Sequence, residues 1–280
     1  MKSIKFQYFL SHCVLIFVSM LAIYPVLWVL KMALSPGDSF DVSPNPFPSE
    51  ISTEHFEKVL GLGQAGSWAF GRQFWNSLIV SGATTLISLG ISLSAAYGFS
   101  RLRFPGRDVG LLALMLTQIF PGVVMLVPLY IILDFCNLLD TLSGLCLVYC
   151  ATALPFCTWM LKGYFDSLPV EMEEAAVIDG AGRFTIFWYL ILPLARPAIA
   201  VTALFSFMTA WNEFILAATL LGDSSLFTLP VALQQHVGEF QTQWGSFAAG
   251  AVVTSLPIMI LFYALQRHLV GGLTGGSVKG

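Results

Sequence analysis

The sequence predicts an all-α membrane protein with six transmembrane helices and both termini in the cytoplasm. Composition, six long apolar runs and the distribution of Lys and Arg support this fold class. Of the 280 residues, 56% are hydrophobic and only 10% are charged, and the mean hydropathy is +0.79. Soluble domains carry about 25% charged residues. We therefore expect a lipid bilayer to solvate most of the surface.

The six apolar runs justify the predicted helices one by one. A helix that crosses a bilayer needs about 20 mainly apolar residues, and suitable runs lie at residues 9–34, 77–100, 111–133, 141–161, 197–222 and 246–266. The first follows Lys2 and Lys5, as a cleaved signal peptide would. Its apolar part is longer than that of a signal peptide and no small-x-small cleavage pattern follows, so we predict a retained helix.

Lys and Arg set the predicted orientation, because cytoplasmic loops carry an excess of both. Ten of the 13 fall on the side of the two termini and three on the other side. Residues 1–8 then form a cytoplasmic N-terminus and residues 9–280 a single transmembrane domain. Within that domain, we predict periplasmic loops over about 35–75 and 222–245 and a cytoplasmic C-terminal tail over 268–280.

Several function classes are disfavoured by what the sequence lacks. The net charge of −3 does not favour nucleic-acid binding. No Gly-x4-Gly-Lys-Ser/Thr phosphate loop, His-Glu-x-x-His or Gly-x-Ser-x-Gly pattern occurs. Cys146 and Cys150 lie four residues apart on one helical face, but no second Cys or His pair accompanies them. We therefore predict a non-enzymatic chain with no catalytic residue, no metal site and no cofactor of its own.

The stretch between the fourth and fifth runs, residues 162–196, is too long for a simple connection. Ser167 is a plausible helix cap, Pro169 suits a first turn and Gly180 suits a stop, so we predict a short cytoplasmic helix over about 167–181. Acidic residues at its start favour the positive end of the helix dipole; they are Glu171, Glu173 and Glu174. A helix lying on lipid would be basic, so we favour docking into a groove on a protein.

This helix resembles a known signature. Glu174-Ala175-Ala176, then Gly180, then Leu190-Ile191-Leu192-Pro193 resembles the EAA motif of bacterial ATP-binding-cassette (ABC) importer permeases, with Leu190 where the usual pattern has Ile. Residues 211–214 resemble the wider carbohydrate-permease family. Residues 228–231, Trp244-Gly245 and the glycine-rich tail resemble MalG-type subunits of maltose transporters.

The resemblance implies a type I ABC importer permease fold in the bacterial inner (cytoplasmic) membrane, with a coupling helix that sits in a cleft of a separate ATPase subunit. The residues implied in ATPase coupling are Glu173, Glu174, Ala175, Ala176, Asp179, Gly180, Ala181 and Arg183. A second contact with the ATPase is implied for the tail, at Gly276, Val278 and Lys279. The third outer loop is implied to reach a solute-binding protein through Thr228, Gln234, Gln235 and His236.

The implied activity is import of a maltose- or maltodextrin-like di- or oligosaccharide, with another sugar or sugar derivative as the alternative. The implied partners are a second homologous permease, two ATPase subunits that use Mg-ATP, a periplasmic or extracellular solute-binding protein and the lipid bilayer, with no nucleic acid. An ion-coupled secondary transporter is the next alternative, because an acid inside a span is a functional hypothesis by default. An intramembrane enzyme would need paired catalytic groups at membrane depth, and none is evident.

Two points stay open from the sequence. Trp211, Asn212 and Glu213 lie inside the fifth run, and they either line a substrate path or hold this helix to a neighbour through hydrogen bonds. Gly90, Ser94 and Gly98 form a small-residue face on the second run. That face packs either within the chain or against a partner subunit.

Overall fold

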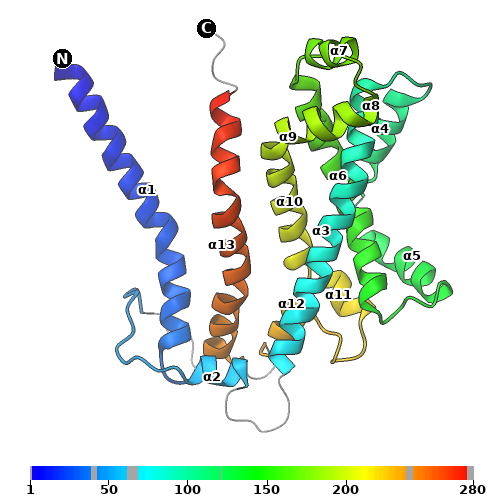
Figure 1. Cartoon of the computed structure of the whole chain (residues 1–280). Coiled ribbons are helices and arrows are strands. Elements are labelled where there is room, and N and C mark those ends of the chain that lie inside the picture. Colours follow the sequence, from blue (N-terminus) through cyan, green and yellow to red (C-terminus); the bar gives the residue numbers. More distant parts are fainter. Residues whose placement is uncertain (1, 39–42, 62–68, 121, 238–241, 276–280) are drawn as a thin grey trace. The chain divides into compact units, whose positions relative to one another are not determined.

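The computed structural model describes residues 2–38, 43–61, 69–120, 122–237 and 242–275, and this part of the chain contains helices and no β-strand (Figure 1). Two compact units are formed, Met1–Gly71 with Ala232–Leu256 and Arg72–Val231 with Pro257–Gly280. The elements in chain order are α1 (Lys2–Leu34), α2 (Glu54–Leu60), α3 (Ala69–Arg101), α4 (Arg107–Leu116), α5 (Gly122–Phe135), α6 (Leu142–Ser167), α7 (Glu171–Ile178), α8 (Arg183–Ile186), the π-helix η1 (Phe187–Ile191), α9 (Leu192–Leu194), α10 (Arg196–Trp211), α11 (Ile215–Leu220), α12 (Leu229–Gln234) and α13 (Trp244–Gly275).

Within the described residues, four helices are long and apolar enough to cross a bilayer by themselves: α1, α3, α6 and α13. A fifth span results if the segments Arg183–Leu194 and Arg196–Trp211, which are bent by 76°, count as one. These helices cover the apolar runs predicted first, second, fourth and sixth. The helices extend beyond some predicted boundaries, since α3 starts at Ala69 and α13 continues to Gly275.

The predicted continuous helices over residues 111–133 and 197–222 are wrong, because both runs break. The first divides into α4 and α5, with a turn at residues 117–120. A proline at position 121 explains this break, since the residue before a proline avoids the helical conformation. The second run breaks after α10 and resumes at α11.

The second break is stabilised by Glu213. Its carboxylate accepts the backbone N–H groups of Leu216 and Ala217 at 2.9 and 3.1 Å and the hydroxyl of Tyr149 at 2.7 Å. A carboxylate at this position satisfies N–H groups that the first turn of α11 leaves without a carbonyl partner. The acid therefore caps α11 and joins it to α6.

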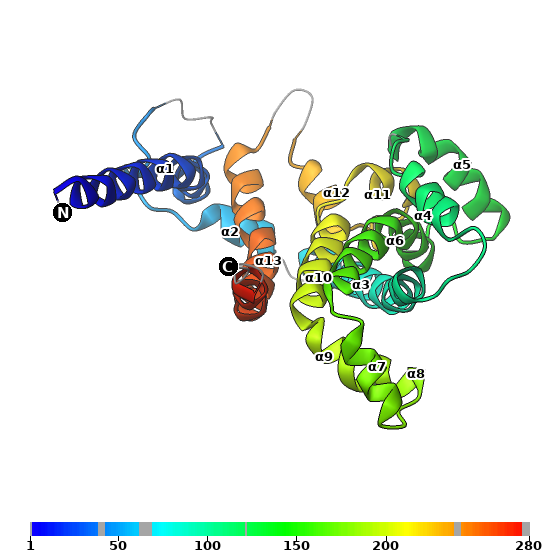
Figure 2. The ribbon, with the colours of Figure 1, turned by 90° about the horizontal axis from the view of Figure 1, so that it is seen from above.

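In the larger unit, α6 lies among α3, α4 and α10, as seen from above in Figure 2. Small polar side chains fill the contact between α3 and α6. Thr158 donates to Ser92 at 3.1 Å, and Cys146 accepts from Thr84 at 3.6 Å. The cysteine pair that could suggest metal ligands from the sequence thus takes part in helix packing, where small side chains let two helices approach closely.

In the smaller unit, His55 of α2 is fully buried. Its Nε2 lies 3.0 Å from the carbonyl of Ser35 and 3.1 Å from that of Gly37, and its Nδ1 lies 3.4 Å from Ser246 Oγ. This buried imidazole joins the segment after α1 to the first turn of α13 and so fixes the two relative to each other. No pattern in the sequence indicates this role for His55.

We predict that Gly245→Ala destabilises the protein. A Cβ at this position would lie 2.2 Å from the His55 ring, and such overpacking costs about 1–3 kcal/mol. Thermal unfolding of the purified protein in detergent measures the loss. Gly163→Ala is the control, since its Cβ meets nothing within 4 Å. Equal melting temperatures for the two variants would contradict the role of His55.

Candidate functional site

The candidate site is α7, the helix with the EAA-like sequence, which lies between α6 and α8 (Figure 1). It begins at Glu171, later than predicted. Ser167 ends α6 and donates its hydroxyl to the carbonyl of Tyr164 at 2.6 Å, and Leu168 is extended. The predictions of Ser167 as the cap and of Pro169 in the first turn are therefore wrong. The predicted acidic first turn is confirmed.

The end of α7 is confirmed at Gly180. This residue has φ of +88°, a conformation that favours glycine. Its N–H donates to the carbonyl of Val177 at 3.0 Å, and the N–H of Ala181 donates to that of Ala176 at 2.9 Å. These two bonds make a Schellman motif, which ends a helix sharply. The turn directs the chain from α7 into α8.

Glu173 faces into the protein and anchors α7 to α3. Arg101, the last residue of α3, donates from Nε to Glu173 Oε1 at 2.5 Å, and Tyr97 donates its hydroxyl to Oε2 at 3.0 Å. Arg101 also donates from Nη2 to the carbonyl of Leu168 at 2.9 Å. Both charged side chains are only 11% exposed. Such a shielded, charge-assisted pair is strong and fixed in geometry, so α7 is tied to a long membrane helix.

The two alanines of the motif face different ways. Ala175 is exposed, whereas Ala176 is half-buried and packs against the cluster of Leu161, Phe165 and Ile186. The predicted coupling residues therefore divide into an inward set, Glu173 and Ala176 with half-buried Ala181, and an outward set, Glu174, Ala175, Asp179, Gly180 and Arg183.

Large apolar side chains, which were not among the predicted residues, are exposed at the end of α7 and on α8. Ile178 is 85% exposed and Phe184 is 76% exposed, and Val177 is exposed beside them. The signal was present in the sequence, because the neighbouring residues Val177 and Ile178 cannot share one face of a helix, so a helix of eight residues cannot bury both on the same side. An exposed acid, a small residue and a large apolar residue on one helix face suit a concave protein surface.

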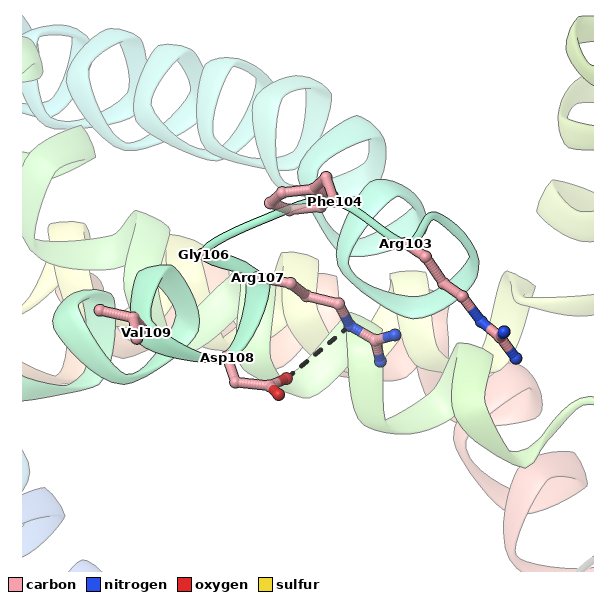
Figure 3. A pocket seen from close by; sticks show the side chains of 6 residues that line it. All are labelled: Arg103, Phe104, Gly106, Arg107, Asp108 and Val109. Atoms are coloured by element: carbon pink, nitrogen blue, oxygen red, sulfur yellow. Dashed lines mark ion pairs between the residues drawn. The ribbon is translucent and has the colours of Figure 1, made fainter.

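The turn from α3 to α4 carries positive charge at the same end of the larger unit as α7 (Figure 1), and Figure 3 shows this turn from close by. Arg103 and Arg107 line a hollow of about 280 Å³ there, together with Phe104, Gly106, Asp108 and Val109. Arg107 Nε lies 4.0 Å from a carboxylate oxygen of Asp108. Because Arg101 precedes this turn, three arginines gather at the end of the larger unit that holds α7.

Two of the three residues predicted as a possible substrate path, Trp211 and Glu213, are engaged within the chain. Trp211 is 2% exposed and stacks on Phe207, with ring centroids 5.4 Å apart and planes at 18°. Glu213 uses both carboxylate oxygens to cap α11 and to bind Tyr149. Asn212 is exposed. These contacts favour the structural alternative for Trp211 and Glu213.

The residues predicted for the third outer loop differ in accessibility. Gln234 and Gln235 are exposed, and His236 is half-buried with Nδ1 3.2 Å from Gln243 Oε1. Thr228 is buried. Earlier in the loop, the backbone N–H of Ser225 donates to Asp223 at 2.8 Å, and this bond lowers the pKa of Asp223. The predicted tail contacts Gly276, Val278 and Lys279 lie outside the described residues.

Comparisons with known proteins place these features in context. Residues 87–274 match the family described as binding-protein-dependent transport system inner membrane component. The chain is 36% identical to the maltose/maltodextrin transport system permease protein MalG of Vibrio vulnificus, over 100% of this chain and 98% of the relative. It is 36% identical to the diacetylchitobiose uptake system permease protein DasC of Streptomyces coelicolor, over 92% of each.

The fold also has a solved counterpart. A chain of a bacterial ABC transporter involved in the import of the acidic polysaccharide alginate superposes with a TM-score of 0.77, over 95% of this chain and 98% of that one, at 23% identity. At this identity the likeness concerns the fold alone. The arrangement of helices described above is therefore one that ABC importer permeases use.

We predict that Arg101 and Glu173 stabilise the protein as a pair. Removal of one partner leaves a shielded charge alone, which costs about 3–5 kcal/mol, whereas the double variant Arg101→Ala/Glu173→Ala loses less than the sum of the single variants. A double-mutant cycle on thermal unfolding measures the difference. Glu171→Ala, at an exposed position of the same helix turn, is the control. Strictly additive losses would contradict the pairing.

Proposed function

Because the chain belongs to the family of binding-protein-dependent transport system inner membrane components, we propose that it translocates a maltose- or maltodextrin-like di- or oligosaccharide into the cytoplasm. It is a permease subunit of a carbohydrate ABC importer, and ATP hydrolysis belongs to a separate subunit. The observation that supports coupling between the two is α7, tied to α3 by Arg101 and Glu173 and open to a partner on its other face.

The proposed coupling is mechanical. When two ATPase subunits close on Mg-ATP, each moves the helix docked in its cleft as a rigid body. In this chain the outward residues Glu174, Ala175 and Ile178 would meet the ATPase. The Arg101–Glu173 pair would pass the motion to α3, and the permease would change between inward-facing and outward-facing states. The tail residues Gly276, Val278 and Lys279 are proposed as a second ATPase contact.

We propose six membrane spans with both termini in the cytoplasm of a bacterial inner membrane. α1, α3, α6 and α13 supply four spans, α4 with α5 supplies the third in chain order, and α10 with α11 supplies the fifth. The orientation is supported by the arginines at the same end of the larger unit as α7, since cytoplasmic ends carry the excess of positive charge.

The proposed partners are a second homologous permease, two ATPase subunits and a periplasmic solute-binding protein. The small-residue face of α3 supports the second permease, because a Cβ at Gly90 or Gly98 would meet no described atom of this chain within 4 Å. A face of small residues that is left open permits close approach by a helix of another subunit. Gln234, Gln235 and His236 are proposed to face the binding protein.

The sugar itself is the less specific part of the proposal. The two relatives compared above are named for maltodextrins and for diacetylchitobiose, so an importer for another oligosaccharide is the second candidate. An ion-coupled secondary transporter receives no support from Glu213, because both its oxygens are used in internal hydrogen bonds. ATP-dependent uptake into proteoliposomes of the whole complex, tested against a proton gradient without ATP, discriminates between the two mechanisms.

We predict that Gly180→Val uncouples transport from ATP hydrolysis while the chain remains in the membrane. Open space surrounds Gly180, but its φ of +88° is strained for any side chain and most of all for a β-branched one. The turn after α7 would therefore shift. Asn tolerates this conformation, so Gly180→Asn is the matched variant that should retain more coupling. The ratio of ATP hydrolysed to sugar transported is the measurement, and an unchanged ratio in Gly180→Val would count against the role of α7.

A further inference from the structure

The break between α4 and α5 opens into a cavity within the larger unit. The cavity has a volume of about 640 Å³ and is lined by residues of α4, α5, α6 and α11 and by the turn at 117–120. Ligand sites for small molecules measure about 300–1,000 Å³ and are mostly apolar with a few polar groups. This cavity matches both criteria.

Polar groups gather on one side of the cavity. Thr117 and Gln118 line it from the turn, and Thr152 lines it from α6. Gln118 donates from Nε2 to the carbonyl of Thr152 at 3.2 Å, which leaves the amide oxygen of Gln118 and one N–H for another partner. Pro155 also lines the cavity and has no N–H, so the carbonyl of Ala151 in the same wall lacks its partner in the helix.

In the proposed six-span arrangement, these groups lie near the middle of the bilayer. Gln118 follows the start of α4 by 11 residues, or about 16 Å at 1.5 Å per residue, and Thr152 is near the middle of α6 (Leu142–Ser167). The hydrocarbon core is about 30 Å thick. Non-helical backbone and amide side chains at this depth are stable only where protein covers them or where they line a water-filled cavity. Gln118 is exposed in this chain and lines the cavity, which meets the second condition.

We propose that the cavity at the α4–α5 break is a carbohydrate-binding segment of the transport path, with Gln118 as its central hydrogen-bonding residue. A sugar ring is amphipathic, since its edge carries hydroxyl groups and its faces are apolar. The free half of the Gln118 amide, Thr117 and the Ala151 carbonyl would bind hydroxyl groups. Apolar residues of the wall, among them Leu129 and Leu216, would contact the faces of the ring.

This site differs from the one suggested by the sequence. Trp211 and Glu213 are engaged in the packing and capping of α10 and α11, and Glu213 fixes the start of the helix whose Leu216 forms part of the wall. Glu213 therefore positions α11, which forms part of the cavity wall, and is not itself a lining residue. The inference rests on the proposed function, because it assigns the substrate of the same transporter to these residues.

The first experiment places a cysteine in the turn. Gln118→Cys and the control Val127→Cys, which is 62% exposed on α5 and outside the cavity wall, are made in a chain with Cys13 and Cys136 changed to Ser. The full complex in membrane vesicles is treated with a charged, water-soluble thiosulfonate. We expect labelling of Gln118→Cys but not of Val127→Cys, and at least fivefold slower labelling with saturating maltotriose or diacetylchitobiose. No labelling, or labelling that neither sugar slows, would overturn the inference.

The second experiment measures uptake. Gln118→Leu removes the hydrogen bonds of the amide and keeps its volume, so the half-saturating sugar concentration should rise about three- to tenfold, as expected for one or two neutral hydrogen bonds. Gln118→Asn should lie between Gln118→Leu and the unmodified chain. An unmodified chain without ATP-dependent sugar uptake would overturn the proposed function itself. Normal uptake by the unmodified chain, with equal half-saturation for all variants, would overturn only the role of Gln118.

Discussion

The ion pair between Arg101 and Glu173 is the interaction on which the functional interpretation depends. It joins the last residue of α3, a long apolar helix, to the first turn of a short helix whose other face is exposed. Without this pair, α7 would be connected to the rest of the chain mainly through the segments before and after it. A displacement of α7 would then deform those segments and would not be transmitted to α3. With this pair, Tyr97 and Arg101 of α3 hold both carboxylate oxygens of Glu173, and Arg101 also binds the carbonyl of Leu168 in the segment before α7. A rigid attachment is what a mechanical coupling between two subunits requires.

The two interrupted apolar runs, residues 111–133 and 197–222, meet a second constraint, because unpaired backbone groups are costly in a bilayer. At the break before α11, the carboxylate of Glu213 accepts backbone N–H groups that have no carbonyl partner in the helix. It also accepts a hydrogen bond from the hydroxyl of Tyr149. At the break before α5, the side-chain amide of Gln118 donates one hydrogen bond to α6, and other polar groups line the cavity. One break is thus closed by the protein's own side chains, whereas the other is available to a ligand. This difference separates a structural acid from a candidate binding amide.

Much of the fold was predictable from the sequence because hydrophobic length and the stop at Gly180 are local signals. Four of the six apolar runs form long helices, and α7 ends where glycine was expected to end it. The start of α7 was missed because Ser167 could cap either helix, and its hydroxyl bonds backward to Tyr164. The inward orientation of Glu173 depends on Arg101, 72 residues earlier, and the burial of His55 depends on Ser246, 191 residues later. No local pattern indicates such pairings.

The central claim, that force enters this chain through the outward face of α7, is tested most directly by crosslinking in native membranes. Ala175 is exposed and Ala176 packs inward, so the two neighbouring positions form a matched pair. A short thiol crosslinker attached to Ala175→Cys should trap a nucleotide-hydrolysing subunit in membranes from the producing cell, and the same reagent at Ala176→Cys should trap far less. Equal trapping at both positions, or no ATPase trapped at Ala175→Cys, would contradict the account.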